Sequence, residues 1–167
     1  AKSDAASEFR YRTNLLDRHS VVIAVSQSGE TADTLAAIKE AKSRGVLTLG
    51  ITNVVGSSQA RETDAGVYTR TGPEISVAST KAFTSQLMIM VLMTLFMGRQ
   101  RQLSQAVGQQ IARELTKIPD LARRVLNTSD RIQELAGKYR DFDNFMYLGR
   151  KYSYPVAMEG ALKLKEI

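Results

Sequence analysis

The residues best suited to chemistry form a run of small polar side chains between an apolar segment and an amphipathic one. Residues 21–25 are five consecutive apolar residues, and residues 32–44 have the apolar spacing of a helix. Free N–H groups at a helix N-terminus attract anions, and the helix dipole adds to this attraction. The turn between the two segments carries four side chains that can hydrogen-bond a phosphate or sugar hydroxyls: Ser26, Gln27, Ser28 and Thr31. The pattern therefore predicts a site for a phosphate ester or a sugar.

A simpler interpretation is that Ser28 or Thr31 only caps the helix, as hydroxyl residues do at many helix starts. A cap requires one such residue, whereas this turn carries four polar side chains. We therefore favour ligand binding over capping alone. Glu30 must point away from a bound phosphate because the two negative charges repel, and it can instead complement the helix dipole.

Two further groups of polar residues have chemical potential. A second polar turn runs from residue 71 to Thr80 and leads into an apolar segment. On a predicted helix at 154–167, three charged residues are spaced by 4 and 3 and so share one face: Glu159, Lys163 and Glu166. From the residues alone, the plainer interpretation of this face is a solvated ladder of ion pairs.

The two polar turns, at 26–31 and 71–80, must be positioned by strands that alternate with helices. The expected strands are 21–25, 46–53 and 65–69, and residues 54–61 are expected to form a loop. This order indicates right-handed crossovers and a parallel sheet, hence an α/β fold. The first strand has no polar alternation, which predicts that it is buried on both faces. Ligands bind at the carboxyl ends of parallel strands, and both polar turns fall there.

The second half of the chain begins with helices. Pro119 divides two predicted helical stretches, 103–118 and 120–138. A fourth strand is expected at 144–148, and with the helix at 154–167 it opens a second strand–turn–helix unit. The predicted last helix lacks a stop signal and the chain does not begin with Met, so we expect a piece of a larger protein.

Composition excludes several classes of site. The chain has 167 residues, of which 43% are hydrophobic and 24% charged, as in one ordinary globular domain. It has no cysteine and one histidine, His19, so a disulfide, a thiolate metal site and a histidine metal cluster are all excluded. The net charge of +6 is spread along the helices without a nucleic-acid motif. This charge suits an anionic metabolite and gives little support for nucleic acid as a partner.

One segment resembles a membrane span. Residues 87–97 are eleven residues, nearly all apolar, which is too short to cross a bilayer. We expect this segment to be a helix buried between the sheet and other helices. The first twenty residues lack the pattern of a signal peptide. The sequence therefore predicts a cytoplasmic protein with no membrane partner.

Three motifs carry a resemblance to a known family. They are SQSGET at 26–31, PEISVASTK at 73–81 and EGALKLKE at 159–166. SQSGET alone would indicate only the sugar isomerase (SIS) superfamily. With all three motifs at these separations, the chain resembles the isomerase half of the glutamine–fructose-6-phosphate aminotransferase family.

The resemblance implies a fold and a domain division. The family has a flavodoxin-like parallel sheet with helices on both faces, a three-layer αβα arrangement, which occurs twice. Residues 1–100 would be a first SIS domain that lacks its first strand, 101–141 would be connecting helices, and 142–167 would begin a second SIS domain. Expressed alone, such a chain is expected to be inactive and to aggregate, because the strand at 21–25 would lose a neighbour.

The resemblance also implies substrate contacts. Fructose 6-phosphate would be bound through its phosphate and nearby hydroxyls by Ser26, Gln27, Ser28 and Thr31. Val77, through its backbone, and Ser79 would contact the sugar. For Ser79, a simple helix cap is an equally good interpretation.

The resemblance implies that the catalytic residues lie on the charged face at 159–166. Glu166 would be the base that moves a proton between C1 and C2 of the sugar, a role that suits a partly buried carboxylate. Lys163 would hold sugar oxygens or assist proton transfer, and Glu159 would orient Lys163.

The implied activity is transfer of the amide nitrogen of glutamine to fructose 6-phosphate, which gives glucosamine 6-phosphate. The family needs no metal and no organic cofactor, and its members carry a glutaminase domain and form homodimers. An alternative is a non-catalytic SIS-domain sensor of sugar phosphates, which would not need the charged face at 159–166. A purely structural module would leave the two polar turns unexplained.

Overall fold

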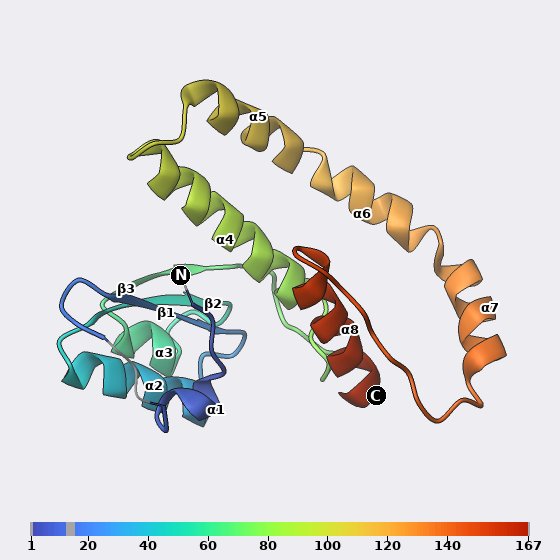
Figure 1. Ribbon diagram of the computed structural model, residues 1–167, viewed down its shortest axis with the longest axis horizontal. Coiled ribbons are helices and arrows are strands. Elements are labelled where there is room, and N and C mark those ends of the chain that lie inside the picture. The colour runs from blue at the N-terminus through green and yellow to red at the C-terminus, as the bar shows by residue number, and fades with distance from the viewer. Residues whose placement is uncertain (1, 13–15, 167) are drawn as a thin grey trace. The chain divides into compact units, whose positions relative to one another are not determined.

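The computed structural model describes residues 2–12 and 16–166 of the chain. The chain divides into two compact units, residues 1–93 and 94–167, and each is described by itself. The elements that begin in the first unit are α1 (Ala6–Phe9), β1 (Val21–Ser26), α2 (Ala32–Ser43), β2 (Leu47–Thr52), α3 (Ser58–Glu62), β3 (Ala65–Tyr68) and α4 (Lys81–Arg99) (Figure 1).

The three strands form one parallel sheet in the order β1-β2-β3. Val21 pairs with Leu47 in β2, and Leu49 of β2 pairs with Ala65 in β3. Each strand and α2 end within one residue of the expected bounds, so the predicted parallel α/β fold is confirmed. The expected loop at 54–61 is partly wrong, because α3 begins at Ser58 after Ser57 Oγ accepts a hydrogen bond from the Ala60 N–H.

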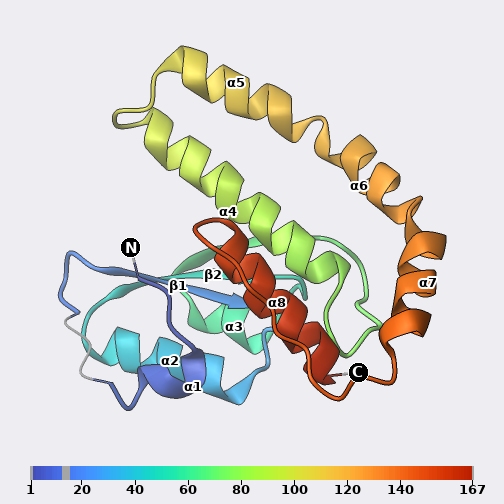
Figure 2. The same cartoon turned by 45° about the vertical axis from the view of Figure 1, so that its right-hand side comes forward.

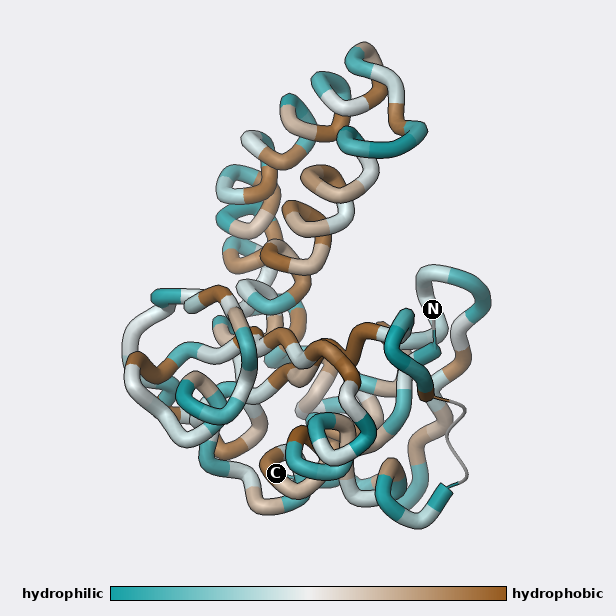
Figure 3. The backbone as a smooth tube through the Cα atoms, turned by 90° about the vertical axis from the view of Figure 1, so that its left-hand side faces the viewer, coloured by the Kyte–Doolittle hydropathy of each residue, from teal (hydrophilic) through white to brown (hydrophobic). Residues whose placement is uncertain are grey.

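The core of this unit lies between the sheet and α2 with α3. Both helices pack on the sheet and lie on the same side of it in two views (Figure 1, Figure 2). Ile38 of α2 and Gln59 of α3 are fully buried there, and so is Thr48 of β2. The hydropathy colouring shows apolar residues along the strands and along α4 (Figure 3).

Apolar side chains on the opposite face of the sheet are exposed among the described residues. Val21 and Ile23 of β1 are 48% and 45% exposed, and Leu47 of β2 is 48% exposed. The prediction that residues 21–25 are buried on both faces is therefore wrong here. The sequence pattern reports an apolar strand, but burial of its second face requires a covering layer on that side of the sheet.

The predicted burial of residues 87–97 is also not found. Ala82 is the one buried residue among the described residues of α4, and Phe96 is 68% exposed. This helix has 19 residues and a mean hydropathy of 1.4 over its most apolar stretch, of which 6% is buried. By length and composition alone, it could cross a membrane. A core helix of a soluble protein passes the same test, so one such helix is weak evidence for a span.

The described part of the second unit contains helices α5 (Gln105–Leu115), α6 (Ile118–Leu126), α7 (Ser129–Tyr139) and α8 (Ser153–Glu166). Three helices replace the two expected between 103 and 138. The division expected at Pro119 is present but lies at Thr116 and Lys117, because Pro119 occupies the first turn of α6, where its missing N–H has no helical partner to lose. The additional break lies at Asn127, after which α7 begins.

The strand expected at 144–148 is not formed, and residues 144–148 lie in a segment without helix or strand. Met146 and Leu148 in this segment are 84% and 83% exposed. A strand requires a hydrogen-bonded neighbour, and the described residues of this unit contain helices but no other strand. The predicted last helix is present as α8, although Ile167 lies outside the described residues.

We expect the α2 side of the sheet to carry most of the stability of the first unit. Ile38→Ala should lower the free energy of unfolding by about 2–5 kcal/mol, because it leaves a cavity in a fully buried position. Ile75→Ala is the matched control, since Ile75 is 93% exposed and its loss should change stability by less than about 0.5 kcal/mol. Urea unfolding followed by circular dichroism measures both, and equal losses would contradict this core.

Candidate functional site

The turn after β1 gathers two hydroxyl groups at the start of α2. Gly29 has a φ of +70°, a backbone conformation that favours glycine. This conformation lets the Gly29 N–H donate to Ser26 Oγ at 3.1 Å. Ser26 Oγ and Thr31 Oγ1 lie 3.3 Å apart, although the two residues are five positions apart in sequence. The predicted binding residues Ser26 and Thr31 are therefore brought together.

The N-terminus of α2 has no side-chain cap. Thr31 occupies the N-cap position with extended backbone, but its side chain accepts no capping hydrogen bond. The Ser28 hydroxyl accepts instead from the Glu30 N–H, at 3.2 Å, within the turn. Capping of α2 is therefore not the function of these hydroxyls, and the first N–H groups of α2 remain available to a ligand.

Glu30 points away from this turn, as charge repulsion requires. Its Oε1 accepts from the Ser58 N–H at 2.8 Å, so the carboxylate lies at the start of α3 and not at α2. Hydrogen bonds from the side chain and the N–H of Ser58 lower the pKa of the Glu30 carboxyl. The α3 N-terminus is thus occupied by a carboxylate of the chain itself.

The start of α4 is filled in the same way by Glu74. Its Oε2 accepts from the N–H groups of Thr80 and Ala82, at 2.9 and 3.0 Å. These bonds, that to Thr80 first, lower the pKa of Glu74 to about 2 from its ordinary 4.5. The contact therefore stabilises the fold fully above pH 4.5 and is lost as the pH falls toward 2.

The cap of α4 thus comes from Glu74, and the interpretation of Ser79 as a helix cap is wrong. Ser79 has a φ of +43°, which is unusual for a residue with a side chain. Val77, the other expected sugar contact on this turn, is 89% exposed. Both residues are accessible to a ligand.

Asn53 connects the two polar turns and was missed in the sequence. Its N–H donates to the Gln27 carbonyl at 3.0 Å, and its Nδ2 donates to the Gly72 carbonyl at 2.6 Å. Its Oδ1 accepts from the Thr71 N–H and from the hydroxyls of Thr69 and Thr71, at 2.9 to 3.0 Å. A polar residue directly after β2, at the carboxyl edge of the sheet, was the available signal.

The charged face of α8 lies in the second unit. Lys163 Nζ forms an ion pair with Glu159 Oε1, and their side chains are 28% and 24% exposed. This contact is the one expected from their spacing. Glu166 is exposed, so the partial burial expected for a base is not found among the described residues.

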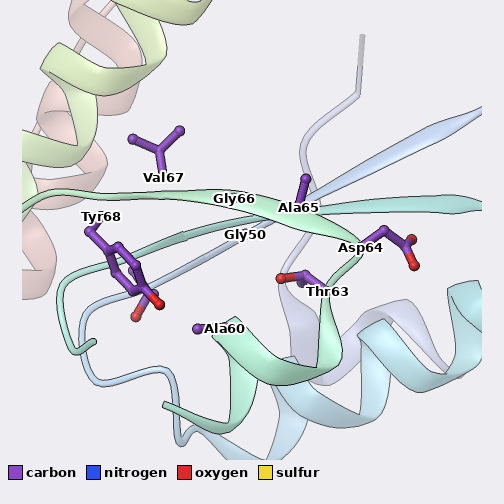
Figure 4. A pocket seen from close by; sticks show the side chains of 9 residues that line it. Gly50, Ala60, Thr63, Asp64, Ala65, Gly66, Val67 and Tyr68 are labelled. Carbon is purple, nitrogen blue, oxygen red and sulfur yellow. The ribbon is translucent and has the colours of Figure 1, made fainter. Parts of the chain in front are cut away.

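A small hollow beside α3 and β3 contains none of the predicted residues (Figure 4). Asp64 at its rim accepts hydrogen bonds from the N–H and the hydroxyl of Thr48, both at 2.8 Å, and pairs with Lys42 at 3.2 Å. These partners hold the pKa of Asp64 below its ordinary value. Within the described chain, no group of three or more acidic, histidine or cysteine side chains could hold a metal ion.

A parallel sheet with an open helix N-terminus at its carboxyl edge is the arrangement of α/β domains, and it is a place where such domains bind anionic ligands. The model of the SIS domain matches residues 1–97, and the chain belongs to this family.

Curated relatives give a more specific similarity. Glutamine–fructose-6-phosphate aminotransferase [isomerizing] of Chlorobaculum tepidum is 51% identical over 98% of this chain, and that of Bacteroides thetaiotaomicron is 53% identical over 97%. The chain spans 27% and 26% of their lengths. The C-terminal domain of glucosamine-fructose-6-phosphate aminotransferase from Francisella tularensis has a TM-score of 0.93 and is 40% identical, over 97% of this chain and 46% of that one.

We expect Gly29 to be essential for the shape of the turn. A Cβ at Gly29 would lie 2.3 Å from Ser57 Oγ and 2.8 Å from Thr52 Oγ1. Gly45→Ala is the matched control, since Gly45 has the same φ of +70° with no atom within 4 Å.

Both substitutions carry the backbone cost of about 1–2 kcal/mol, but only Gly29→Ala adds a clash, so its loss of stability should be larger by at least about 1 kcal/mol. Thermal unfolding of the two variants measures the difference. Equal melting temperatures would show that the turn around residue 29 is not packed as described.

Proposed function

We propose that this chain is part of the isomerase half of a glutamine–fructose-6-phosphate aminotransferase. The observation that carries the proposal is the uncapped N-terminus of α2, with the hydroxyls of Ser26 and Thr31 beside it. The helices α3 and α4 begin on the chain's own carboxylates, so α2 is left to receive a dianion from a ligand. The relatives' names supply the ligand, fructose 6-phosphate.

In this proposal the phosphate accepts hydrogen bonds from the first N–H groups of α2 and from the side chains of the turn. Those side chains are Ser26, Gln27, Ser28 and Thr31. The backbone of Val77 and the hydroxyl of Ser79 contact the sugar. The links of Asn53 to both turns support this assignment, because they fix one turn relative to the other.

The chemical step in this proposal is a proton shift. Glu166 removes a proton from C1 of the open-chain sugar, and the C–H electron pair forms a C1=C2 double bond while the electron pair of the double bond at C2 moves to the heteroatom on C2, which takes up a proton. The protonated Glu166 then returns its proton to C2, and O1 loses its proton as the C1=O double bond forms. Lys163 holds the sugar oxygens, and its ion pair with Glu159 supports a role for Glu159 in orienting it. A sensor of sugar phosphates would need neither this pair nor a base, which makes it the less favoured alternative.

The wider assignments belong to the same proposal. The product is glucosamine 6-phosphate, nitrogen comes from a glutaminase domain of the complete enzyme, and the enzyme is a homodimer. Residues 1–100 form most of one SIS domain, residues 101–141 are helices that connect it to the next, and residues 142–167 begin that second SIS domain. A cytoplasmic location fits the relatives' names, since sugar phosphates are metabolites of that compartment.

Binding is tested in a chimera in which this chain replaces the matching segment of the Chlorobaculum tepidum relative. Ser28→Ala combined with Thr31→Val should weaken fructose 6-phosphate binding by about 1–3 kcal/mol, the range for hydrogen bonds to a charged group. Ser43→Ala, in the last turn of α2, is the control and should leave affinity unchanged. Calorimetry measures all three proteins, and equal affinities would contradict the phosphate site.

The chemical role of Glu166 is tested in the same chimera. Glu166→Gln keeps the shape but cannot take a proton, so turnover and hydrogen exchange at C1 should fall about 100-fold or more, with little change in binding. Glu134→Gln on α7 is the control, since Glu134 is an exposed glutamate outside the proposed site. Normal exchange in the Glu166 variant would leave this residue without a chemical role.

A further inference from the structure

Glu74 forms hydrogen bonds across the loop that leads into α4. Its carboxylate reaches Thr80, six residues later, and Ala82, eight residues later. Both oxygens are used, because Oε1 accepts from Thr80 Oγ1 at 3.0 Å while Oε2 accepts from the two N–H groups. The segment 75–79 lies inside this closure and is neither helix nor strand.

Packing does little to hold the segment 75–79. Ile75 and Val77 are 93% and 89% exposed, and Ala78 is the one buried residue of the segment. Ser79 is held at a φ of +43°, a conformation that the surrounding structure must enforce. The closure by Glu74 is the interaction that can do so, since it fixes the residues directly before and after the segment.

The carboxylate also decides where an anion can bind. The N-terminus of α4 would otherwise offer N–H groups to a phosphate, as that of α2 does. Because Glu74 already supplies a negative charge there, a second anion would be repelled. The phosphate group of a sugar phosphate that lies near both turns can therefore bind at the N-terminus of α2 but not at that of α4.

We infer that Glu74 is a positioning residue: its carboxylate holds the segment 75–79 so that Val77 and Ser79 face the sugar, and it directs the phosphate to α2. This inference rests on the proposed binding of fructose 6-phosphate. A purely structural role as a cap of α4 is the alternative. The two roles differ in what they affect, since a cap changes stability alone, whereas a positioning residue changes affinity for the sugar.

The test uses Glu74→Gln in the chimera, with Glu62→Gln at the end of α3 as the control. Titrations with fructose 6-phosphate and with inorganic phosphate separate the sugar contacts from the phosphate site. We expect Glu74→Gln to raise the KM for fructose 6-phosphate by about tenfold, the scale of one lost polar contact. The affinity of the α2 turn for inorganic phosphate should stay within about twofold, because this turn is unaltered, and any second phosphate that the variant binds should lie at the start of α4, where the carboxylate no longer repels it. The shorter carboxylate of Glu74→Asp should recover part of the loss.

An unchanged KM with a lower melting temperature would overturn the inference and leave Glu74 as a helix cap. If Glu74→Gln does not fold, Thr80→Ala decides the question, because it removes one of the three hydrogen bonds and keeps both N–H donors. A rise in KM supports the inference and an unchanged KM overturns it. Absence of sugar-phosphate binding in the unaltered chimera would instead contradict the proposed function itself.

Discussion

The site depends on one electrostatic arrangement: of the three helices that follow the strands, two begin at a carboxylate of the chain itself and the third, α2, does not. Glu30 lies at the start of α3 and Glu74 at the start of α4, whereas the start of α2 has only neutral hydroxyls beside it. An open helix N-terminus holds unsatisfied N–H groups and a partial positive charge. Among the three helices that follow the strands, only α2 keeps this potential, directly after the turn SQSGET that follows β1, whereas a carboxylate of the chain neutralises it at α3 and α4.

The parallel sheet makes this arrangement possible. All three strands end at the same edge, so the turns that follow β1, β2 and β3 come together there. Asn53, after β2, uses its backbone and its side chain to link the first turn to the third. The backbone and side-chain hydrogen bonds of this one asparagine thus set the relative position of the two polar turns that the proposed substrate requires.

The local pattern of the sequence predicted the strands, α2 and the first polar turn, because apolar runs and hydroxyl residues report local structure directly. Contacts between distant residues were not predictable in this way. The partners of Glu30 and Glu74 lie across turns, and the role of Asn53 depends on residues up to 26 positions away. The prediction of a strand at 144–148 was wrong for a related reason. A strand needs a hydrogen-bonded neighbour, and the pattern of one segment cannot show whether that neighbour is present. Glu166 was likewise expected to be partly buried, and its exposure depends on what packs on α8.

The most direct test of the account is a crystal structure of the chimera with fructose 6-phosphate bound. The account predicts that the phosphate lies at the N-terminus of α2, within hydrogen-bond distance of Ser26 or Thr31 and of the first N–H groups of the helix. It also predicts that Glu74 keeps its bonds to Thr80 and Ala82. A phosphate bound at the start of α4 in place of Glu74, or bound away from both turns, would contradict it.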